Sequence, residues 1–365
     1  MKTILRTFVG CTAILFGTAC MGAVKYVPEN MKVELSLKVP GNNAVNYKLH
    51  PDKLENSYFD YEWRSDNKLP ITVFHKVEER DSCMRLTVQL TAAQDVYFNY
   101  RQLLSTGYRH DNCQFYMPGF WYRRNLRSPK KAPSFHTSDS WLVREDRLSA
   151  PLTGIFSEKE KRFMTVNRLD DFSMDALATH KEGEIILSGK TSLGFTGFEN
   201  QQGIAMLSFG FPYREAPKSY IRKLTLAPEV EAFQLMKKGE SVLLTWEIME
   251  SGADDFSDFI QHTWEHCYDT YAPKPVENSY SIADMKQVLS CFFVNSLVDN
   301  QPLVYNSGIH LKVSDCERNG QAEVGFIGRV LLNAFNAWEY GWQSNREELK
   351  VNSTKIFDSY LKNGF

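Results

Sequence analysis

The stretch MKVELSLKV, residues 31–39, decides the first half of the fold. Apolar and polar residues alternate strictly along it, and a period of two is typical of a β-strand with one buried face. The alternation recurs further along the chain, and residues 157–161 (SEKEK) indicate the tip of a hairpin. We therefore predict a large antiparallel β-sandwich over residues 24–250. Its further strands are expected at 69–77, 84–90, 155–169, 184–188, 203–211, 220–226 and 241–249.

After Glu250 the spacing of apolar residues lengthens to the helical period. We predict a helix over 256–271, followed by a proline-containing linker, so that residues 251–280 connect the sandwich to a helical region at 281–365. That region has three predicted helices, from Ser281 to about 297, over 322–340 ending at Gly341, and over 346–362. The helix over 322–340 is apolar on nearly every side, so we expect other elements to surround it.

Residues 1–23 have the zones of a secretory signal peptide. Lys2 and Arg6 precede an apolar run from Phe8 to Ala19, which is too short to span a membrane. We therefore expect an exported protein, located in the periplasm or at the outer membrane of a Gram-negative bacterium. Two cleavage sites stay open. The sequence before Cys20 resembles the lipobox of bacterial lipoproteins, which would give a lipid anchor, whereas ordinary cleavage would leave none.

The composition excludes one class of partner and limits the chemistry of the cysteines. The net charge is −2 with both signs interspersed, so we expect no nucleic-acid partner. Five cysteines follow the signal without CxxC spacing, and we predict isolated buried thiols, with one or two disulfides as the alternative. These cysteines are Cys83, Cys113, Cys267, Cys291 and Cys316.

Residues 108–133 show no strand alternation and are predicted to form a long loop, and such loops in compact domains are usually functional. Aromatic rings beside guanidinium groups suit a sugar that carries a carboxylate, because the ring stacks while arginine binds the anion. In the alternative, the aromatic residues pack on the sandwich and the arginines pair with acids such as Asp111 and Asp139. The predicted substrate-binding residues are Arg109, His110, Trp121, Tyr122, Arg123, Arg124, Asn125 and Arg127.

Three other polar groups are expected to be structural. His262, Glu265 and His266 match the HxxEH signature of zinc peptidases, but a third ligand is needed and Glu323 is the one candidate. We therefore predict a surface helix, no metal and no cofactor. Glu323 itself is expected to favour its helix dipole rather than act as a general acid. The charged run REDR at 144–147 is expected to satisfy its own charges.

Several segments together resemble a known architecture. They are the signal sequence, the sandwich with its MPGFWYRRN loop at 117–125, the helix ending in YAPKP at 271–275, and the EVGFIGR helix at 323–329. The chain resembles the N-terminal part of bacterial polysaccharide-degrading enzymes, in which a β-supersandwich precedes an (α/α) toroid. The resemblance implies a glycoside hydrolase acting on an acidic, uronic-acid-containing polysaccharide.

A complete toroid has many more helices than the four predicted here, so we expect a chain truncated within the toroid and assign no catalytic residue. Whether the chain is an active enzyme is left open. The alternatives are a non-catalytic glycan-binding module, or a zinc metallopeptidase that uses His262, Glu265 and His266. Neither the polysaccharide nor the oligomeric state can be predicted.

Overall fold

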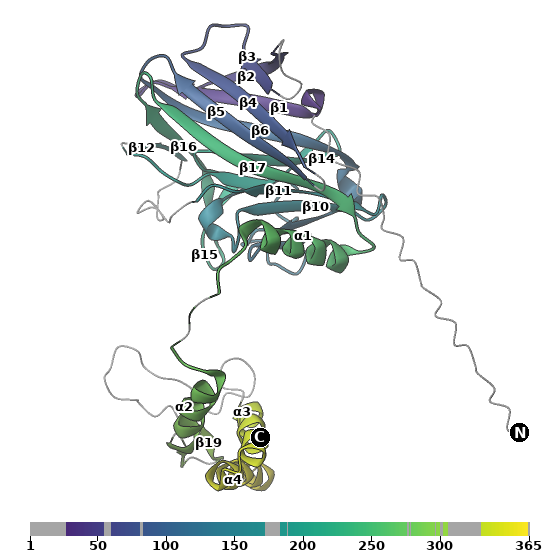
Figure 1. Ribbon diagram of the computed structural model, residues 1–365, viewed down its shortest axis with the longest axis vertical. Coiled ribbons are helices and arrows are strands. Elements are labelled where there is room, and N and C mark those ends of the chain that lie inside the picture. The colour runs from purple at the N-terminus through teal and green to yellow at the C-terminus, as the bar shows by residue number, and fades with distance from the viewer. Residues whose placement is uncertain are drawn as a thin grey trace, which may run out of the picture. The chain divides into compact units, whose positions relative to one another are not determined.

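The computed structural model describes residues 27–54, 60–80, 83–171, 183–187, 189–275, 277, 279–295, 297–299, 302–305 and 330–363. The chain divides into two compact units, residues 1–272 and 273–365. Strands dominate the first unit and helices the second, so the predicted order of β before α is confirmed (Figure 1). The signal peptide with Cys20, and Glu323 with Cys316, lie outside the described residues.

The described part of the first unit contains seventeen strands, and every pairing between them is antiparallel except that of β12 with β16. Their bounds are β1 (Met31–Lys38), β2 (Val45–Lys53), β3 (Asp60–Arg64), β4 (Ile71–Glu79), β5 (Cys83–Ala92), β6 (Val96–Arg109), β7 (Cys113–Met117), β8 (Trp121–Arg123), β9 (Trp141–Arg144), β10 (Leu152–Ser157), β11 (Arg162–Arg168), β12 (Gly183–Leu187), β13 (Phe195–Gln201), β14 (Ile204–Phe211), β15 (Arg214–Arg222), β16 (Thr225–Met236) and β17 (Ser241–Gly252).

The strands form two layers that share β2. One layer contains β1, β6, β14, β13, β9, β15, β16 and β12, in the order of their pairings. The other contains β3, β4, β5, β17, β11, β10, β7 and β8. Residues 45–49 of β2 pair with β1, and residues 50–53 pair with β3, so one strand joins both layers.

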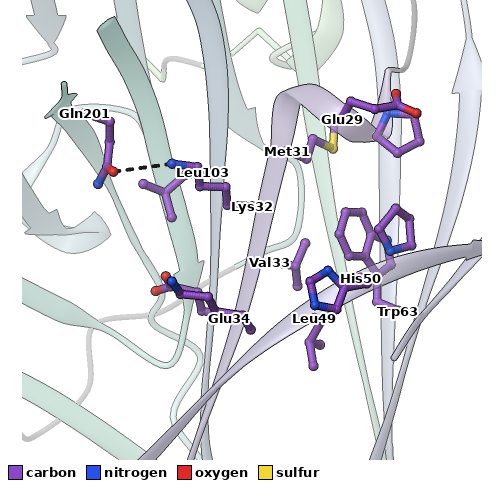
Figure 2. A pocket seen from close by; sticks show the side chains of 13 residues that line it. Glu29, Met31, Lys32, Val33, Glu34, Leu49, His50, Trp63, Leu103 and Gln201 are labelled. Atoms are coloured by element: carbon purple, nitrogen blue, oxygen red, sulfur yellow. Dashed lines mark hydrogen bonds between the residues drawn. The ribbon is translucent and has the colours of Figure 1, made fainter. Parts of the chain in front are cut away.

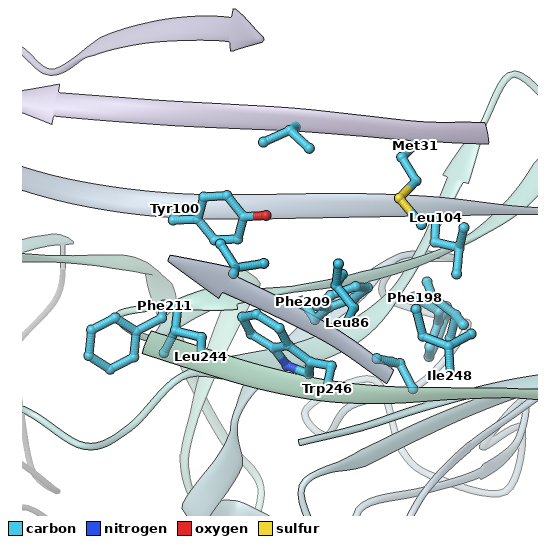
Figure 3. Close-up of a cluster of buried hydrophobic side chains, with 14 of the residues drawn as sticks. Met31, Leu86, Tyr100, Leu104, Phe198, Phe209, Phe211, Leu244, Trp246 and Ile248 are labelled. Atoms are coloured by element: carbon cyan, nitrogen blue, oxygen red, sulfur yellow. The ribbon is translucent and has the colours of Figure 1, made fainter. Parts of the chain in front are cut away.

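The main core lies between the layers, where the inward faces of the strands meet. Figure 3 shows Tyr100 and Leu104 of β6 facing Leu86 of β5 and Trp246 of β17, and all four side chains are buried. Burying such a side chain stabilises the fold by about 1.5–3 kcal/mol. The alternation holds in the first part of β1, where Met31, Val33 and Leu35 are buried while Lys32 is exposed, but at its end Lys38 is buried and Val39 is exposed.

Helix α1 (Phe256–Tyr271) belongs to the first unit and lies along β10 and β11 (Figure 1). The Asp255 carboxylate caps it by accepting hydrogen bonds from the backbone amides of Ser257 and Asp258. Phe259 is fully buried, and its ring packs on Phe156 and Phe163 in a second hydrophobic cluster. The apolar stripe that predicted this helix is therefore its attachment to the sandwich.

The second unit contains α2 (Ile282–Asn295), the short strands β18 (Leu297–Val298) and β19 (Val304–Tyr305), α3 (Val330–Gln343) and α4 (Glu347–Asn363). Helices α3 and α4 share a small core, whereas Ser290 is the one fully buried residue of α2. Helix α3 ends at Gln343 rather than at the predicted Gly341, and Gly341 allows close packing on α4, because a Cβ there would lie 3.1 Å from the side chains of Leu349 and Lys350. None of the described helices combines the length and apolarity needed to cross a membrane.

Two local predictions differ from the structure. The strand expected over 220–226 is divided between two strands: residues 220–222 end β15 and residues 225–226 begin β16, with a turn at 223–224, where Leu224 has a φ of 57°. The loop expected over 108–133 contains β7 and β8, which pair with each other through Phe115, Tyr116 and Met117. The described cysteines are all free thiols, with Cys83, Cys113 and Cys267 buried and Cys291 exposed.

Candidate functional site

Strand β8 and the residues that follow it line a hollow of about 550 Å³, which we call the arginine hollow. Its lining consists of Gln114 from β7 and the continuous stretch 122–128. Five of the predicted substrate-binding residues are among them. The lining residues are Gln114, Tyr122, Arg123, Arg124, Asn125, Leu126, Arg127 and Ser128.

The backbone of this segment adopts an uncommon conformation. Arg123 has a φ of 58° and Asn125 a φ of 47°, and non-glycine residues in the left-handed region carry strain that the surroundings must offset. The Asn125 side chain supplies part of that support. Its Oδ1 accepts from the Tyr122 amide at 3.1 Å, and its Nδ2 donates to the carbonyls of Phe120 and Pro133, both at 3.2 Å. Asn125 therefore fixes the shape of the segment.

The three arginines of the hollow differ in how they are held. Arg124 donates to the Cys113 and Asp111 carbonyls and lies 5.3 Å from the Phe135 ring centroid, so it supports the loop. Arg123 donates to Gln114 at 3.0 Å and lies over the Phe256 ring at 4.7 Å. Arg127 is exposed and has no ion pair or hydrogen bond within the described part of the chain.

Within the same described residues, no carboxylate forms an ion pair with any of these three guanidinium groups. Beside them lie two exposed apolar side chains, Tyr122 at 52% and Leu126 at 59% exposure. The Tyr122 hydroxyl accepts from the Gly119 amide at 3.2 Å, which holds its ring in place. The hollow thus offers free positive charge next to an accessible aromatic ring.

The other predicted residues lie elsewhere. Trp121 is fully buried, packs against Trp141 and Phe198, and donates from Nε1 to the Arg123 carbonyl at 2.9 Å, so its ring supports the segment from inside rather than facing a ligand. His110 is also buried, and burial lowers its pKa. Arg109 is exposed, 3.4 Å from Asp111, and does not line the hollow. Sequence alone does not show which members of an aromatic-rich stretch point inward.

The charged run at 144–147 satisfies its own charges only in part, because Arg144 pairs with Asp146 whereas Glu145 and Arg147 pair with Arg168 and Glu215 elsewhere in the sandwich. Arg144 contacts Asp146 through two hydrogen bonds of 2.6 and 2.9 Å, and Glu145 accepts from Arg168 at 2.6 Å. Burial raises the pKa of Glu145, and the Arg168 guanidinium opposes that rise. The cluster lies inside the sandwich and supports its structure.

A second hollow, of about 410 Å³, was not predicted from the sequence. Figure 2 shows Lys32 and Gln201 on one side of it and Glu29, His50 and Trp63 on the other. Lys32 donates to Gln201 at 3.5 Å. Its lining carries acids and bases together, so its charge selects no class of ligand as clearly as the arginine hollow does.

The HxxEH residues do not share a site. Glu265 accepts from Gln261 at 2.8 Å, and His262 Nε2 lies 3.5 Å from Asp258. His266 instead donates to Glu247 of β17 at 2.7 Å. In the described regions, the metal-ligand atoms that converge are those of Cys83, Glu247 and His266. Glu323, the proposed third ligand, lies outside those regions.

Comparisons with known proteins concern the fold alone. No family model matches the chain, and no curated protein matches its sequence. It is similar to a polysaccharide lyase at 12% identity and a TM-score of 0.32, with 91% of this chain and 53% of the lyase covered. It is also similar to a galactose mutarotase related enzyme from Lactobacillus acidophilus, at 10% identity and a TM-score of 0.32, with 60% of this chain and 79% of that chain covered.

A third similar structure is a GH36 α-galactosidase from Geobacillus stearothermophilus, at 11% identity and a TM-score of 0.30, with 61% of this chain and 30% of that chain covered. The chain thus spans about half the length of the lyase and less of the galactosidase. All three names describe carbohydrate-active proteins. The similarity assigns no residue and no activity to this chain.

Proposed function

We propose that this chain is an exported carbohydrate-active protein that binds an acidic, uronic-acid-containing glycan at the arginine hollow. One observation carries the proposal. Three guanidinium groups that form no ion pair with a carboxylate among the described residues line the hollow beside the exposed ring of Tyr122. Carboxylate and guanidinium form charge-assisted hydrogen bonds, often in pairs, and a sugar ring has an apolar face that stacks on an aromatic ring.

Each residue has a distinct role in this proposal. Arg127 is the primary anion ligand, because it is exposed and holds no competing contact in the described part of the chain. Arg123 is a secondary ligand, since its Nη1 is engaged by Gln114. Tyr122 stacks on the sugar, and Asn125 keeps the strained segment in its binding conformation.

Glycoside hydrolase activity and non-catalytic glycan binding both remain compatible with this site. No catalytic residue is assigned, and the lipid anchor at Cys20 and the truncation within a toroid stay predictions. Turnover separates the two: release of shorter oligosaccharides favours a hydrolase, and binding without product favours a binding module.

The test is titration of the purified protein with a uronic-acid oligosaccharide and with its neutral, carboxyl-reduced counterpart. We expect binding of the acidic form only, weakened by added salt. Arg127→Ala and Tyr122→Ala should each weaken binding at least about tenfold, which is about 1.4 kcal/mol. Arg109→Ala is the matched control, because Arg109 is an exposed arginine outside the hollow and should leave the affinity unchanged.

Circular dichroism should show that all variants keep the fold. Equal binding of the acidic and neutral oligosaccharides would show that the protein does not recognise the carboxylate. Loss of binding in Arg109→Ala but not in Arg127→Ala would place the site elsewhere. Absence of binding across acidic glycans of different linkage would overturn the function itself.

A further inference from the structure

Three side chains with different metal-ligand chemistry converge on the side of the sandwich that α1 covers. They are Cys83 at the start of β5, Glu247 in β17 and His266 in α1. The Cys83 Sγ, a Glu247 carboxylate oxygen and an imidazole nitrogen of His266 all lie within 4.8 Å of one another. Strand pairing explains part of this convergence: Cys83 lies opposite Met249, so Glu247 is its diagonal neighbour on the same face.

The three residues form a site that is closed on most sides. Cys83 and Glu247 are buried, whereas the His266 side chain keeps 20% of its surface exposed. Solvent therefore reaches the group from the helix side. Thr270, one turn further along α1, donates to Glu247 Oε1 at 3.0 Å and lies 3.5 Å from His266 Nε2.

We propose that Cys83, Glu247 and His266 bind a divalent transition metal of the zinc class, which links α1 to strands β5 and β17. A thiolate, an imidazole and a carboxylate are the donors that zinc sites combine, with metal–sulfur distances of about 2.3 Å and metal–nitrogen distances of about 2.0–2.1 Å. A tetrahedral ion with those bond lengths separates its ligand atoms by about 3.3–3.8 Å. Small side-chain rotations would therefore bring the three donors into range, with water in the fourth position.

The charges balance when the metal binds. The Cys83 thiol loses its proton to solvent as the metal–sulfur bond forms, and the thiolate and the carboxylate together offset the two positive charges of the ion. Without a metal, burial and the nearby Glu247 charge raise the pKa of Cys83 to about 11, so the thiol stays neutral. Burial opposes ionisation of Glu247, but hydrogen bonds from His266 and Thr270 prevail and lower its pKa to about 2.

Two neighbours would form the outer shell of the site. The Arg85 guanidinium lies 3.6 Å from Glu247 Oε2 and can stay beside that oxygen while the other oxygen turns to the metal. The Thr270 hydroxyl can keep its hydrogen bond to the carboxylate, as groups behind metal ligands commonly do. His266 would exchange its 2.7 Å hydrogen bond to Glu247 for the metal.

The experiment uses the full chain and the metals alone, Co²⁺ as a spectroscopic probe and Zn²⁺ as its competitor. We expect one Co²⁺ per chain and a thiolate-to-cobalt charge-transfer band in the near ultraviolet, which Zn²⁺ abolishes. Cys83→Ser should remove the band, and His266→Gln should weaken metal affinity at least about tenfold. Two matched controls should leave the charge-transfer band and the metal affinity unchanged. They are Cys291→Ser at an exposed thiol and His262→Ala in the HxxEH signature.

Absence of a thiolate band in the unmodified protein would overturn the proposal whether or not the variants fold. Loss of metal in His262→Ala would move the site to the HxxEH residues, and loss in Cys291→Ser would assign the band to another thiol. If Cys83→Ser does not fold, alkylation of the unmodified protein decides. Zn²⁺ should slow the modification of Cys83, measured by mass spectrometry, and equal rates with and without Zn²⁺ would refute the site.

Discussion

His75 is a titratable residue in the centre of the sandwich. It is fully buried, and its Nε2 donates to the Tyr100 hydroxyl at 2.9 Å, because that hydroxyl itself donates to Gln102 at 2.8 Å. The Gln102 amide in turn contacts Met31 Sδ at 3.0 Å. Burial lowers the pKa of His75 to about 3, so the folded protein holds a neutral imidazole.

This residue predicts how stability depends on pH. The unfolded chain protonates His75 near pH 6.5 and the folded chain only near pH 3, so the unfolded state binds more protons between these values. The free energy of unfolding should fall by about 1.4 kcal/mol per pH unit as the pH drops through this window. Urea unfolding between pH 7 and pH 4.5 measures it. His75→Gln should flatten the slope, and the exposed His50→Gln should not.

Buried His110 should also make the free energy of unfolding fall as the pH drops, to a smaller extent than His75, because burial lowers its pKa as well. Below about pH 4.5 the depressed pKa of Glu247 contributes too, since its carboxylate stabilises the fold only while it is ionised. An unchanged slope in His75→Gln would mean that this imidazole is solvated in the native protein.

At this scale the sequence indicated several residues that line the arginine hollow but not which neighbouring side chains point inward, and their role in binding stays a prediction. Arg123, Arg124 and Arg127 line the hollow as the composition of their segment suggested, whereas neighbouring Trp121 is in the core. Tyr122 and Trp121 are adjacent aromatic residues, and only strand pairing decides which of them is exposed. The group of Cys83, Glu247 and His266 left no local signal, because its members come from separate strands and a helix.

At the scale of elements, Gly154 of β10 controls how α1 attaches to the sandwich. A Cβ at this position would lie 2.5 Å from the Phe259 ring, so Gly154→Ala should displace α1 and lower the free energy of unfolding by about 1–3 kcal/mol. Gly189→Ala is the control, because nothing lies within 4 Å of its Cβ. Urea denaturation compares the two, and an equal effect of both substitutions would show that α1 does not pack tightly on β10.

Elements whose sequence pattern involves only neighbouring residues formed where they were predicted. The hairpin of β10 and β11 and the helix at 256–271 each depend on neighbours in sequence, and both formed where expected. Strands β7 and β8 were missed because Tyr116 and Met117 are both buried, which breaks the alternation. Layer order could not be predicted either, since β6 pairs with β1, β14 and β16, and only long-range packing selects those partners.

At the scale of the whole molecule, the division between residues 272 and 273 predicts where proteases cut. Residues 273–275 and 277 are exposed without helix or strand, and such segments are preferred sites of nicking. Limited digestion with a glutamate-specific protease should cut after Glu277 before it cuts after any glutamate of the first unit, and the larger fragment should still melt cooperatively. Mass spectrometry identifies the cut, and first cleavage inside the sandwich would contradict this division.

Strand β6 cannot pair with β14 until the ribosome has synthesised β14. Residues 204–211 leave the ribosome about 100 residues after β6, which at ordinary elongation rates is a delay on the order of ten seconds. The delay between the synthesis of β5 and that of its partner β17 is longer still. During that interval the nascent chain exposes apolar strands with unpaired edges, and such strands are prone to aggregation until their partners are synthesised.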